Sequence, residues 1–286
     1  MSQAAEKPIT TAKSRGIARV VSGMPTQDGA GVKLTRLIGT PQLGNVDPFL
    51  MLDAFGTDNP KDYIAGFPEH PHRGFETMTY MIQGTMQHRD NHGGEGLITD
   101  GGVQWMTAGR GVAHSEMPAQ TGGRMFGFQL WINLPAKEKM RAPWYADIPA
   151  SAIPSFGVEG AAVKLIAGEW NGRKGPAPER VTAPFIADVT LAANASTQVP
   201  LPEGHAGFVY VFEGAQTVGG TIVNAGNIGV LSDGGPFSVN ANTHGARLLV
   251  VAGKPLREPI AKYGPFVMNT ADEIRQAIHD YQSGKF

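Results

Sequence analysis

Short apolar or alternating runs recur along the chain, and each ends near Gly, Pro, Asn or Asp. Examples are FETMTYMIQG, MFGFQLWINLP, FIADVTLAAN, GFVYVFEG and ARLLVVAG. Val, Ile, Phe, Tyr and Thr, which favour strands, are common inside them. Runs of this length, separated by turn residues, predict an all-β protein built as a sandwich or a barrel.

Only two stretches have a helical pattern. The first is short and covers AKEKMR, residues 136–141. The second is TADEIRQAIHDYQSG, residues 270–284, in which Thr270 can cap the helix and Glu273 stands three residues on. Its apolar stripe consists of Ile274, Ile278 and Tyr281. We expect this stripe to bury one face of a C-terminal helix against a barrel.

The chain also repeats itself weakly. YMIQGTMQHRD resembles YVFEGAQTVGG, and GGVQWMTAGRG resembles AGNIGVLSDGG, with a spacing of about 130 residues in both pairs. Two similar β-barrels in tandem are the simplest interpretation. The boundary is expected in LPAKEKMRAPWYADIPASAIPS, which is rich in Pro and Ala. This predicts an N-terminal domain over residues 1–140 and a C-terminal domain over 141–286.

Composition excludes several functional classes. Lys plus Arg is 24 and Asp plus Glu is 25, which gives a net charge of −1. The chain therefore lacks the excess of positive charge that would indicate direct nucleic-acid binding. There is no Cys, which excludes disulfides, thiolate metal sites and thiol nucleophiles. No run has the length of a signal peptide's apolar core or of a membrane span. We therefore expect a cytoplasmic protein without membrane contact.

Two pairs of potential metal ligands stand out. His70 and His72 in FPEHPHRGFE, and His114 and Glu116 in GRGVAHSEMP, are each spaced i, i+2. In a strand such residues share one face and lie about 6.5–7 Å apart along the chain, so both can reach one ion at about 2.0–2.2 Å. An isolated H-x-H is more often structural, but a second pair favours a metal site. Three imidazoles and a carboxylate suit Fe, Mn, Ni, Cu or Zn.

Other candidate residues have simpler interpretations. His88 and His92 are expected in a turn or strand, although His88 would face the site if its strand lined the barrel. Arg73 and Arg110 are expected to be exposed or paired with carboxylates, with contact to an anionic substrate as the alternative. A further group is expected to fill barrel core or to line an apolar pocket beside the metal: Phe67, Trp105, Met106, Phe126 and Phe128. His205 and His244 have no i+2 partner of ligand type. The second barrel is therefore predicted to be metal-free.

The two ligand segments resemble cupin motifs. HPHRGFE followed by Gly is similar to G-x5-H-x-H-x3,4-E-x6-G, and TAGRGVAHSE is similar to P-x-G-x2-H-x3-N. Gly66 lies only four residues before His70, Thr107 replaces the Pro, and no Asn ends the second motif. These departures match the pirin family, which HPHRGFET, QWMTAGRGVAHSEMP and REPIAKYGPFVMNT resemble closely. The resemblance runs from about residue 15 to the end.

The resemblance implies two tandem cupin (double-stranded β-helix, or jelly-roll) barrels with a short C-terminal helix. It implies one divalent transition metal in the N-terminal barrel only, usually Fe(II), with Mn, Ni, Cu, Co or Zn as alternatives. The implied ligands are His70, His72, His114 and Glu116. Glu76, a ligand in many cupins, becomes a neighbouring group instead.

The resemblance to the pirin family also implies a function, for which two alternatives stay open. Some pirins have quercetin 2,3-dioxygenase activity, which implies a small aromatic, flavonol-like substrate and dioxygen. Glu116 or Glu76 would take the substrate hydroxyl proton. A metal-dependent regulatory protein that acts through a protein partner is the alternative, and an isomerase or another cupin enzyme stays open. An open mouth over the metal would favour the enzyme, whereas a closed mouth and a large exposed apolar patch would favour the partner protein.

Overall fold

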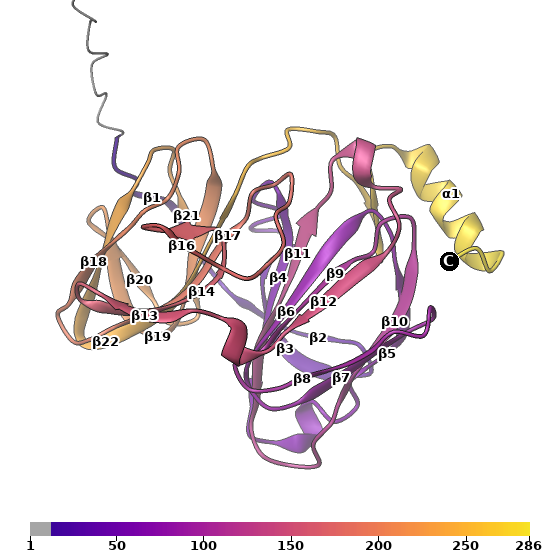
Figure 1. Ribbon diagram of the computed structural model, residues 1–286, viewed down its shortest axis with the longest axis horizontal. Coiled ribbons are helices and arrows are strands. Elements are labelled where there is room, and N and C mark those ends of the chain that lie inside the picture. Colours follow the sequence, from indigo (N-terminus) through magenta and orange to yellow (C-terminus); the bar gives the residue numbers. More distant parts are fainter. Residues whose placement is uncertain (1–12) are drawn as a thin grey trace, which may run out of the picture.

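The computed structural model describes residues 13–286 and consists almost entirely of β-strands, arranged as two barrel-like units with one α-helix at the C-terminal end (Figure 1). The prediction of an all-β chain with a C-terminal helix is confirmed.

Two sheets form the N-terminal unit. The larger has seven strands in the order β12 (Trp144–Ile148), β9 (Val103–Thr107), β6 (Phe75–Gln83), β11 (Met125–Asn133), β4 (Phe49–Thr57), β3 (Val32–Ile38) and β2 (Met24–Asp28). The smaller has four strands in the order β5 (Phe67–His72), β10 (Val112–Pro118), β7 (Met86–Asp90) and β8 (Glu95–Ile98). All these neighbours are antiparallel.

One nine-stranded sheet forms most of the C-terminal unit. Its main path is β1 (Ile17–Ser22), β21 (Asn227–Leu231), β19 (Ala206–Val218), β22 (Phe237–Gly253), β17 (Phe185–Leu191), β14 (Ala161–Ala167) and β13 (Ser155–Val158). Two further strands join it, β18 (Ser196–Val199) on β22 and β20 (Thr221–Asn224) on β19.

The remaining elements are short. They are the hairpins β15 (Glu169–Trp170) with β16 (Arg173–Lys174) and β23 (Ala261–Tyr263) with β24 (Phe266–Met268), the 3-10 helices η1 (Pro60–Asp62), η2 (Ala136–Glu138) and η3 (Ala150–Ala152), and α1 (Ala271–Gln282). The helix predicted over 136–141 is thus a single 3-10 turn. It ends where Lys139 turns inward, because its buried Nζ donates to Gly74 O, Asn133 Oδ1 and Val267 O at 2.6–3.0 Å.

The predicted boundary at residues 140/141 does not separate the units cleanly. Strand β1 pairs with β21 in the C-terminal sheet, although it lies near the start of the chain. Strand β12 pairs with β9 in the N-terminal sheet, although it follows residue 140. The segment 254–286, here called the C-terminal arm, returns to the N-terminal unit. Each unit is therefore completed by a segment from the other half of the chain.

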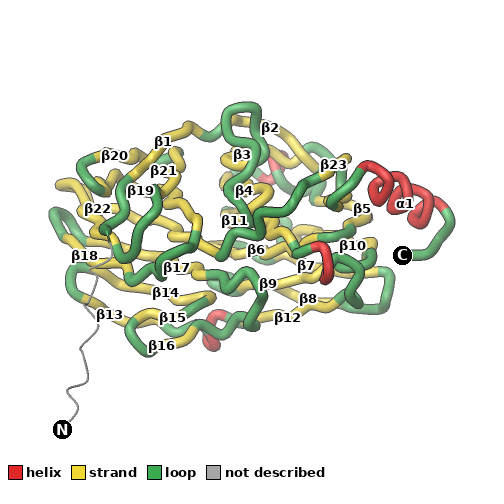
Figure 2. Tube along the Cα trace, turned by 90° about the horizontal axis from the view of Figure 1, so that it is seen from above, coloured by secondary structure: helices red, strands yellow, loops and turns green. Residues whose placement is uncertain are grey.

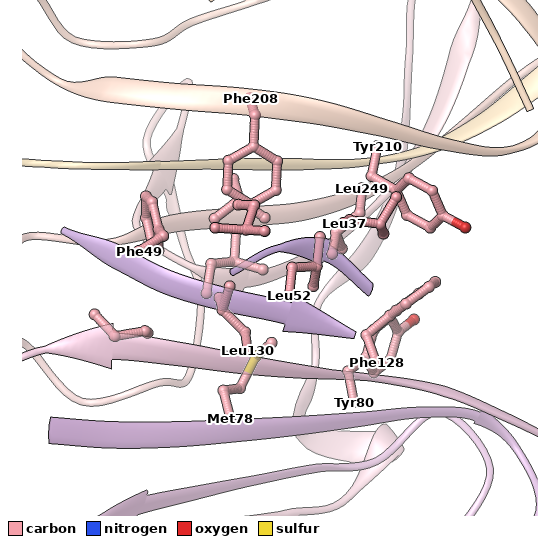
Figure 3. Close-up of a cluster of buried hydrophobic side chains, with 14 of the residues drawn as sticks. Leu37, Phe49, Leu52, Met78, Tyr80, Phe128, Leu130, Phe208, Tyr210 and Leu249 are labelled. Carbon is pink, nitrogen blue, oxygen red and sulfur yellow. The ribbon is translucent and has the colours of Figure 1, made fainter. Parts of the chain in front are cut away.

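A continuous apolar cluster joins the two units (Figure 3). The rings of Phe49 and Phe208 meet edge to face at 5.5 Å, and those of Phe128 and Tyr210 at 5.7 Å. Trp105, expected in a barrel core, also lies in this cluster. Burying apolar surface between the two sheets is the main force that holds the units together.

The interiors of the two barrels differ in character. Alternate residues of β6 point to opposite faces, so Met78 and Tyr80 enter the interface while Thr79 points into the N-terminal barrel. The C-terminal barrel is filled by a separate apolar cluster that includes Trp170 and Phe237. The N-terminal barrel carries polar side chains such as Thr79 on its inner face, whereas the interior of the C-terminal barrel is mainly apolar and buries few polar residues, Gln216 among them.

The C-terminal arm docks beside β5 at a glycine. Gly74 has φ +89°, and a Cβ at this position would lie 2.0 Å from Val267 O. This close approach lets Val267 N donate to Arg73 O at 3.0 Å. Figure 2 shows β23 and α1 on the side of the molecule that holds β5 and β10.

Helix α1 has the predicted start but a different buried face. Thr270 and Glu273 form the capping box, which confirms that prediction. Ile274 is buried, but Tyr281 is 39% exposed, so the stripe predicted to include Tyr281 is wrong at that position. Asp280 takes the inner place instead, because its carboxylate binds the buried guanidinium of Arg73 at 2.9 Å.

The substitution Ile274→Ala tests whether α1 is part of the folded unit. Deleting buried methyl groups should lower the free energy of unfolding by about 2 kcal/mol or more, measured by urea denaturation. Arg275→Ala is the matched control on the exposed side of the helix. Equal midpoints for both variants would show that α1 packs too loosely to stabilise the protein.

Candidate metal centre

The pairing of β5 with β10 brings the two predicted ligand pairs together. In this antiparallel ladder His114 lies opposite His70, and Val112 lies opposite His72. The register shifts between His114 and Glu116, so that Glu116 lies opposite Phe67. Residues from two segments more than 40 positions apart along the sequence thus share one face of the small sheet.

Three imidazoles form a compact cluster. One ring nitrogen each from His70, His72 and His114 lies within 4.8 Å of the other two. The ring centroids are 4.4 Å apart for His70 and His114, 4.7 Å for His70 and His72, and 5.0 Å for His72 and His114. Three nitrogen ligands about 2.0–2.1 Å from one ion require spacings of this order.

Hydrogen bonds at Nδ1 leave Nε2 as the free ring nitrogen of each histidine. His70 Nδ1 contacts Pro68 O at 2.8 Å, and His72 Nδ1 contacts Pro265 O of the C-terminal arm at 3.4 Å. A carbonyl only accepts, so the proton is assigned to Nδ1, and Nε2 keeps its lone pair in a neutral ring. His114 Nε2 is buried without a hydrogen-bond partner among residues 13–286, as expected of a ligand atom. The donor set therefore fits a transition metal.

Burial favours the neutral form of His72 and His114. Desolvation lowers the pKa of His72 and of His114 well below the usual value, and the neighbouring imidazoles lower both further. Only the neutral ring has a free lone pair for a metal. These two histidines therefore remain in the form that binds metal as the pH falls below neutrality.

Glu116 lies in the same pocket but is held by other side chains. Its Oε1 accepts from Thr79 Oγ1 at 2.9 Å, and its Oε2 accepts from Gln129 Nε2 at 3.1 Å. Its carboxylate is not part of the compact group formed by the three histidines. A carboxylate has about four lone-pair positions, so these two bonds leave positions for another partner.

The structure does not bring Glu76 to this cluster. Glu76 lies on the face of β6 opposite to Thr79, where Oε1 accepts from Thr107 Oγ1 at 2.6 Å and pairs with Arg180 Nε at 2.8 Å. Burial raises the pKa of Glu76, and the charge of Arg180 opposes that rise. Arg180 belongs to the C-terminal half, so Glu76 links the two units instead of bordering the histidines.

His88 is the residue that the sequence pattern undervalued. It is fully buried on β7, and its Nδ1 lies 3.2 Å from Nδ1 of His114. Since His114 needs a free Nε2, its Nδ1 carries the proton and His88 accepts it. His92 is exposed in the following turn. The signal in the sequence was the place of His88 just after Gly84, on a strand that could line the barrel, and the pairing of β7 with β10 brings it to His114.

A cavity of about 770 Å³ opens over the histidines. It reaches from Glu116 and Gln129 to exposed residues such as Glu69, so it is accessible from the surface. Its apolar lining includes Phe67, as predicted for a pocket beside the metal, together with Leu34, Met51, Phe55, Met86 and Trp131. This cavity is suited to a planar apolar molecule with a few polar groups.

The two histidines of the C-terminal unit do not meet. His205 Nε2 contacts Ala183 O at 3.0 Å, while His244 is exposed beside Thr243. Within residues 13–286 the histidines on β5 and β10 form the one group arranged for a metal. Arg73 is paired with Asp280, as the default interpretation of that residue expected.

Comparison with known proteins agrees with this architecture. The Pirin family model matches residues 31–132, and the model of the pirin C-terminal cupin domain matches residues 186–286. The chain is 48% identical over 278 residues to a Pseudomonas aeruginosa protein named "Putative quercetin 2,3-dioxygenase PA3240", covering 94% of this chain and 97% of that protein. Mouse pirin is 38% identical and aligns over 96% of this chain and 94% of its own length.

A solved structure shows the same fold. The crystal structure of a quercetin 2,3-dioxygenase from Acinetobacter baumannii superimposes with a TM-score of 0.89 at 37% identity, covering 96% of this chain and 99% of that one. Fold and site together define a two-domain cupin protein with a histidine cluster in its first barrel. More narrowly, the chain belongs to the pirin family. In the part of the chain that the structure describes, no helix is long and apolar enough to cross a membrane.

The variant His88→Ala tests the hydrogen bond to His114. Loss of the acceptor should lower metal affinity by about 10- to 100-fold, measured by competition with a chromophoric chelator. His88→Gln, whose amide oxygen can accept from Nδ1, should restore part of the affinity. His92→Ala is the exposed control. Unchanged affinity in His88→Ala would show that His88 does not orient its neighbour.

Proposed function

We propose that this chain is a metal-dependent dioxygenase that cleaves a flavonol such as quercetin, with dioxygen as co-substrate. The observation that carries the proposal is the group of three histidine ring nitrogens, all within 4.8 Å of one another, beside an aromatic-lined cavity of about 770 Å³. The relative from P. aeruginosa and the A. baumannii structure, both named for quercetin 2,3-dioxygenase, support the choice of substrate class.

We propose His70, His72, His114 and Glu116 as the ligands of one divalent transition metal, with Fe(II) as the first candidate and Mn, Ni, Cu, Co or Zn as alternatives. Nitrogen and oxygen donors without sulfur suit these ions. The bound ion would supply Lewis acidity, which lowers the pKa of a substrate hydroxyl. Glu116 can join the ligand set and keep its bonds to Thr79 and Gln129, because those bonds use only part of its lone pairs.

The protein's own side chains would bind the substrate and take its proton. Glu116 Oε1 or Oε2 accepts the hydroxyl proton of the flavonol, while Thr79 and Gln129 hold the carboxylate in place. Trp131, whose ring lies 5.1 Å from that of His72, provides an aromatic wall against which a planar substrate can stack. Because Glu76 faces Arg180 and the other unit, the proposal assigns the base role to Glu116.

The alternative of a regulatory protein acting through a partner predicts a closed mouth over the histidines. The cavity instead includes exposed residues, among them Glu69 and Lys262, and is large enough for a small-molecule substrate. This feature favours the enzyme. We expect a small-molecule substrate as the primary ligand of the pocket.

The proposal is tested with protein stripped of metal and reloaded in turn with Fe(II), Mn(II), Ni(II), Cu(II), Co(II) or Zn(II). At least one form should consume oxygen with quercetin in air and remove the flavonol absorption band. Glu116→Gln should lower kcat by about 100-fold or more, because an amide cannot accept the proton. Metal content is measured on the same samples. Lost turnover with metal retained would indicate loss of the base, whereas lost metal would indicate loss of a ligand.

Glu76→Gln is the control for the base assignment. It should keep its turnover, although it weakens the pair with Arg180. Lost turnover in Glu76→Gln alone would move the base role to Glu76. If no metal form consumes oxygen with quercetin or related flavonols, the dioxygenase proposal is contradicted.

A further inference from the structure

One cation beside the histidines has no role in the chemistry described so far. Lys262 lies on β23 of the C-terminal arm and lines the same cavity as His70, His72 and Glu116. Its Nζ is 5.0 Å from the ring centroid of Trp131, and that ring is 5.1 Å from the ring of His72. The aromatic wall therefore runs from the candidate metal site to this ammonium.

The other permanent cation of the cavity is already neutralised. Arg36 donates through Nε at 2.8 Å and Nη2 at 2.7 Å to Asp53, and Nη2 also contacts Asp28 at 2.8 Å. Asp28 and Asp53 carry two negative charges against the single charge of Arg36, and both attract Lys262 from beyond ion-pair distance. Within residues 13–286 no carboxylate lies within ion-pair distance of Lys262 Nζ.

The surroundings of Lys262 leave room for an anion. Desolvation and the charge of Arg36 lower the pKa of Lys262, as expected of an ammonium that has lost part of its water without gaining a carboxylate. Its side chain is exposed at the mouth of the cavity. An incoming oxygen anion would replace the missing hydration and form a charge-assisted hydrogen bond.

The backbone that carries Lys262 is tied to the strand of His70 and His72. Lys262 belongs to the hairpin of β23 and β24, whose turn carries Pro265. Pro265 O contacts His72 Nδ1, and Val267 in the next strand contacts Arg73. The same short hairpin therefore orients a candidate metal ligand and presents a cation to the pocket.

We propose that Lys262 is a specificity-determining residue that binds an anionic oxygen of the substrate at the outer end of the cavity. The pocket then selects planar aromatic molecules that carry an ionised oxygen away from the reacting hydroxyl. This inference rests on the proposed function for the aromatic substrate class. It adds that the substrate must carry a negative charge, which a residue of the C-terminal arm recognises.

The test compares two probes with metal-free and metal-loaded protein. One is quercetin sulfonate, which carries a permanent anion, and the other is 3-hydroxyflavone, which has no ionised substituent outside the reacting ring. Dissociation constants are measured by quenching of tryptophan fluorescence. Lys262→Met should weaken binding of the sulfonate by about 10- to 100-fold and leave binding of 3-hydroxyflavone within about twofold. Lys262→Arg, which keeps the charge, should bind the sulfonate nearly as well as the natural protein.

Lys137→Met, at an exposed lysine outside the cavity, is the matched control and should change neither constant. Equal sulfonate affinity in the natural protein and Lys262→Met would overturn the inference. In turnover assays the effect of Lys262→Met should appear in KM, with kcat retained. Charge-dependent binding without oxygen uptake would support Lys262 and contradict the dioxygenase. Turnover with an unchanged KM in Lys262→Met would support the dioxygenase and contradict the role of Lys262.

Discussion

The contact between Gly74 and the carbonyl of Val267 is the constraint on which the site depends. A Cβ at residue 74 would lie 2.0 Å from that oxygen, so any other residue would push the C-terminal arm away from β5. With glycine in place, Lys139 bridges Gly74 O and Val267 O from its buried position, and burial lowers its pKa to about 8. The docked arm then supplies the carbonyl of Pro265 that fixes the tautomer of His72. The candidate metal centre is thus built from two strands of the first barrel and closed by the other end of the chain.

The second barrel packs against the first and differs from it in the character of its interior. Its interior is filled mainly by apolar side chains such as Trp170 and Phe237, and Gln216 is one of its few buried polar residues. Its outer face forms the interface, where Tyr80 Oη donates to Asp188 Oδ2 at 2.7 Å and Arg247 pairs with the same carboxylate. These buried polar links specify how the sheets align, while the apolar cluster supplies most of the stabilisation. Strands β6 and β11 present Thr79 and Gln129 to the cavity and Tyr80 and Phe128 to the interface, so the second unit packs behind this wall of the cavity.

The sequence predicted the parts of the site that depend on local spacing. The i, i+2 periodicity of strands placed His70, His72 and His114 on one face, and the capping box located the start of α1. The sequence did not predict on which face of its strand Glu76 lies. Strand alternation cannot be counted across Gly74, because the positive φ of this residue interrupts the strand between β5 and β6. Nor could the sequence show Pro265 or Lys262 beside the histidines, since about 190 residues separate the segments and only the docked arm joins them. Tyr281 was misplaced for a similar reason, because the pairing of Asp280 with Arg73 turns the helix.

Anomalous diffraction from crystals of the metal-loaded protein tests the account most directly. Data collected above and below the absorption edge of the loaded metal would locate every bound ion. The account predicts one anomalous peak per chain, in the N-terminal barrel, at about 2.0–2.2 Å from the Nε2 atoms of His70, His72 and His114. It also predicts a carboxylate oxygen of Glu116 at a similar distance and no peak near His205 or His244. A peak in the C-terminal barrel, or an ion bound by fewer than three of these imidazoles, would contradict it.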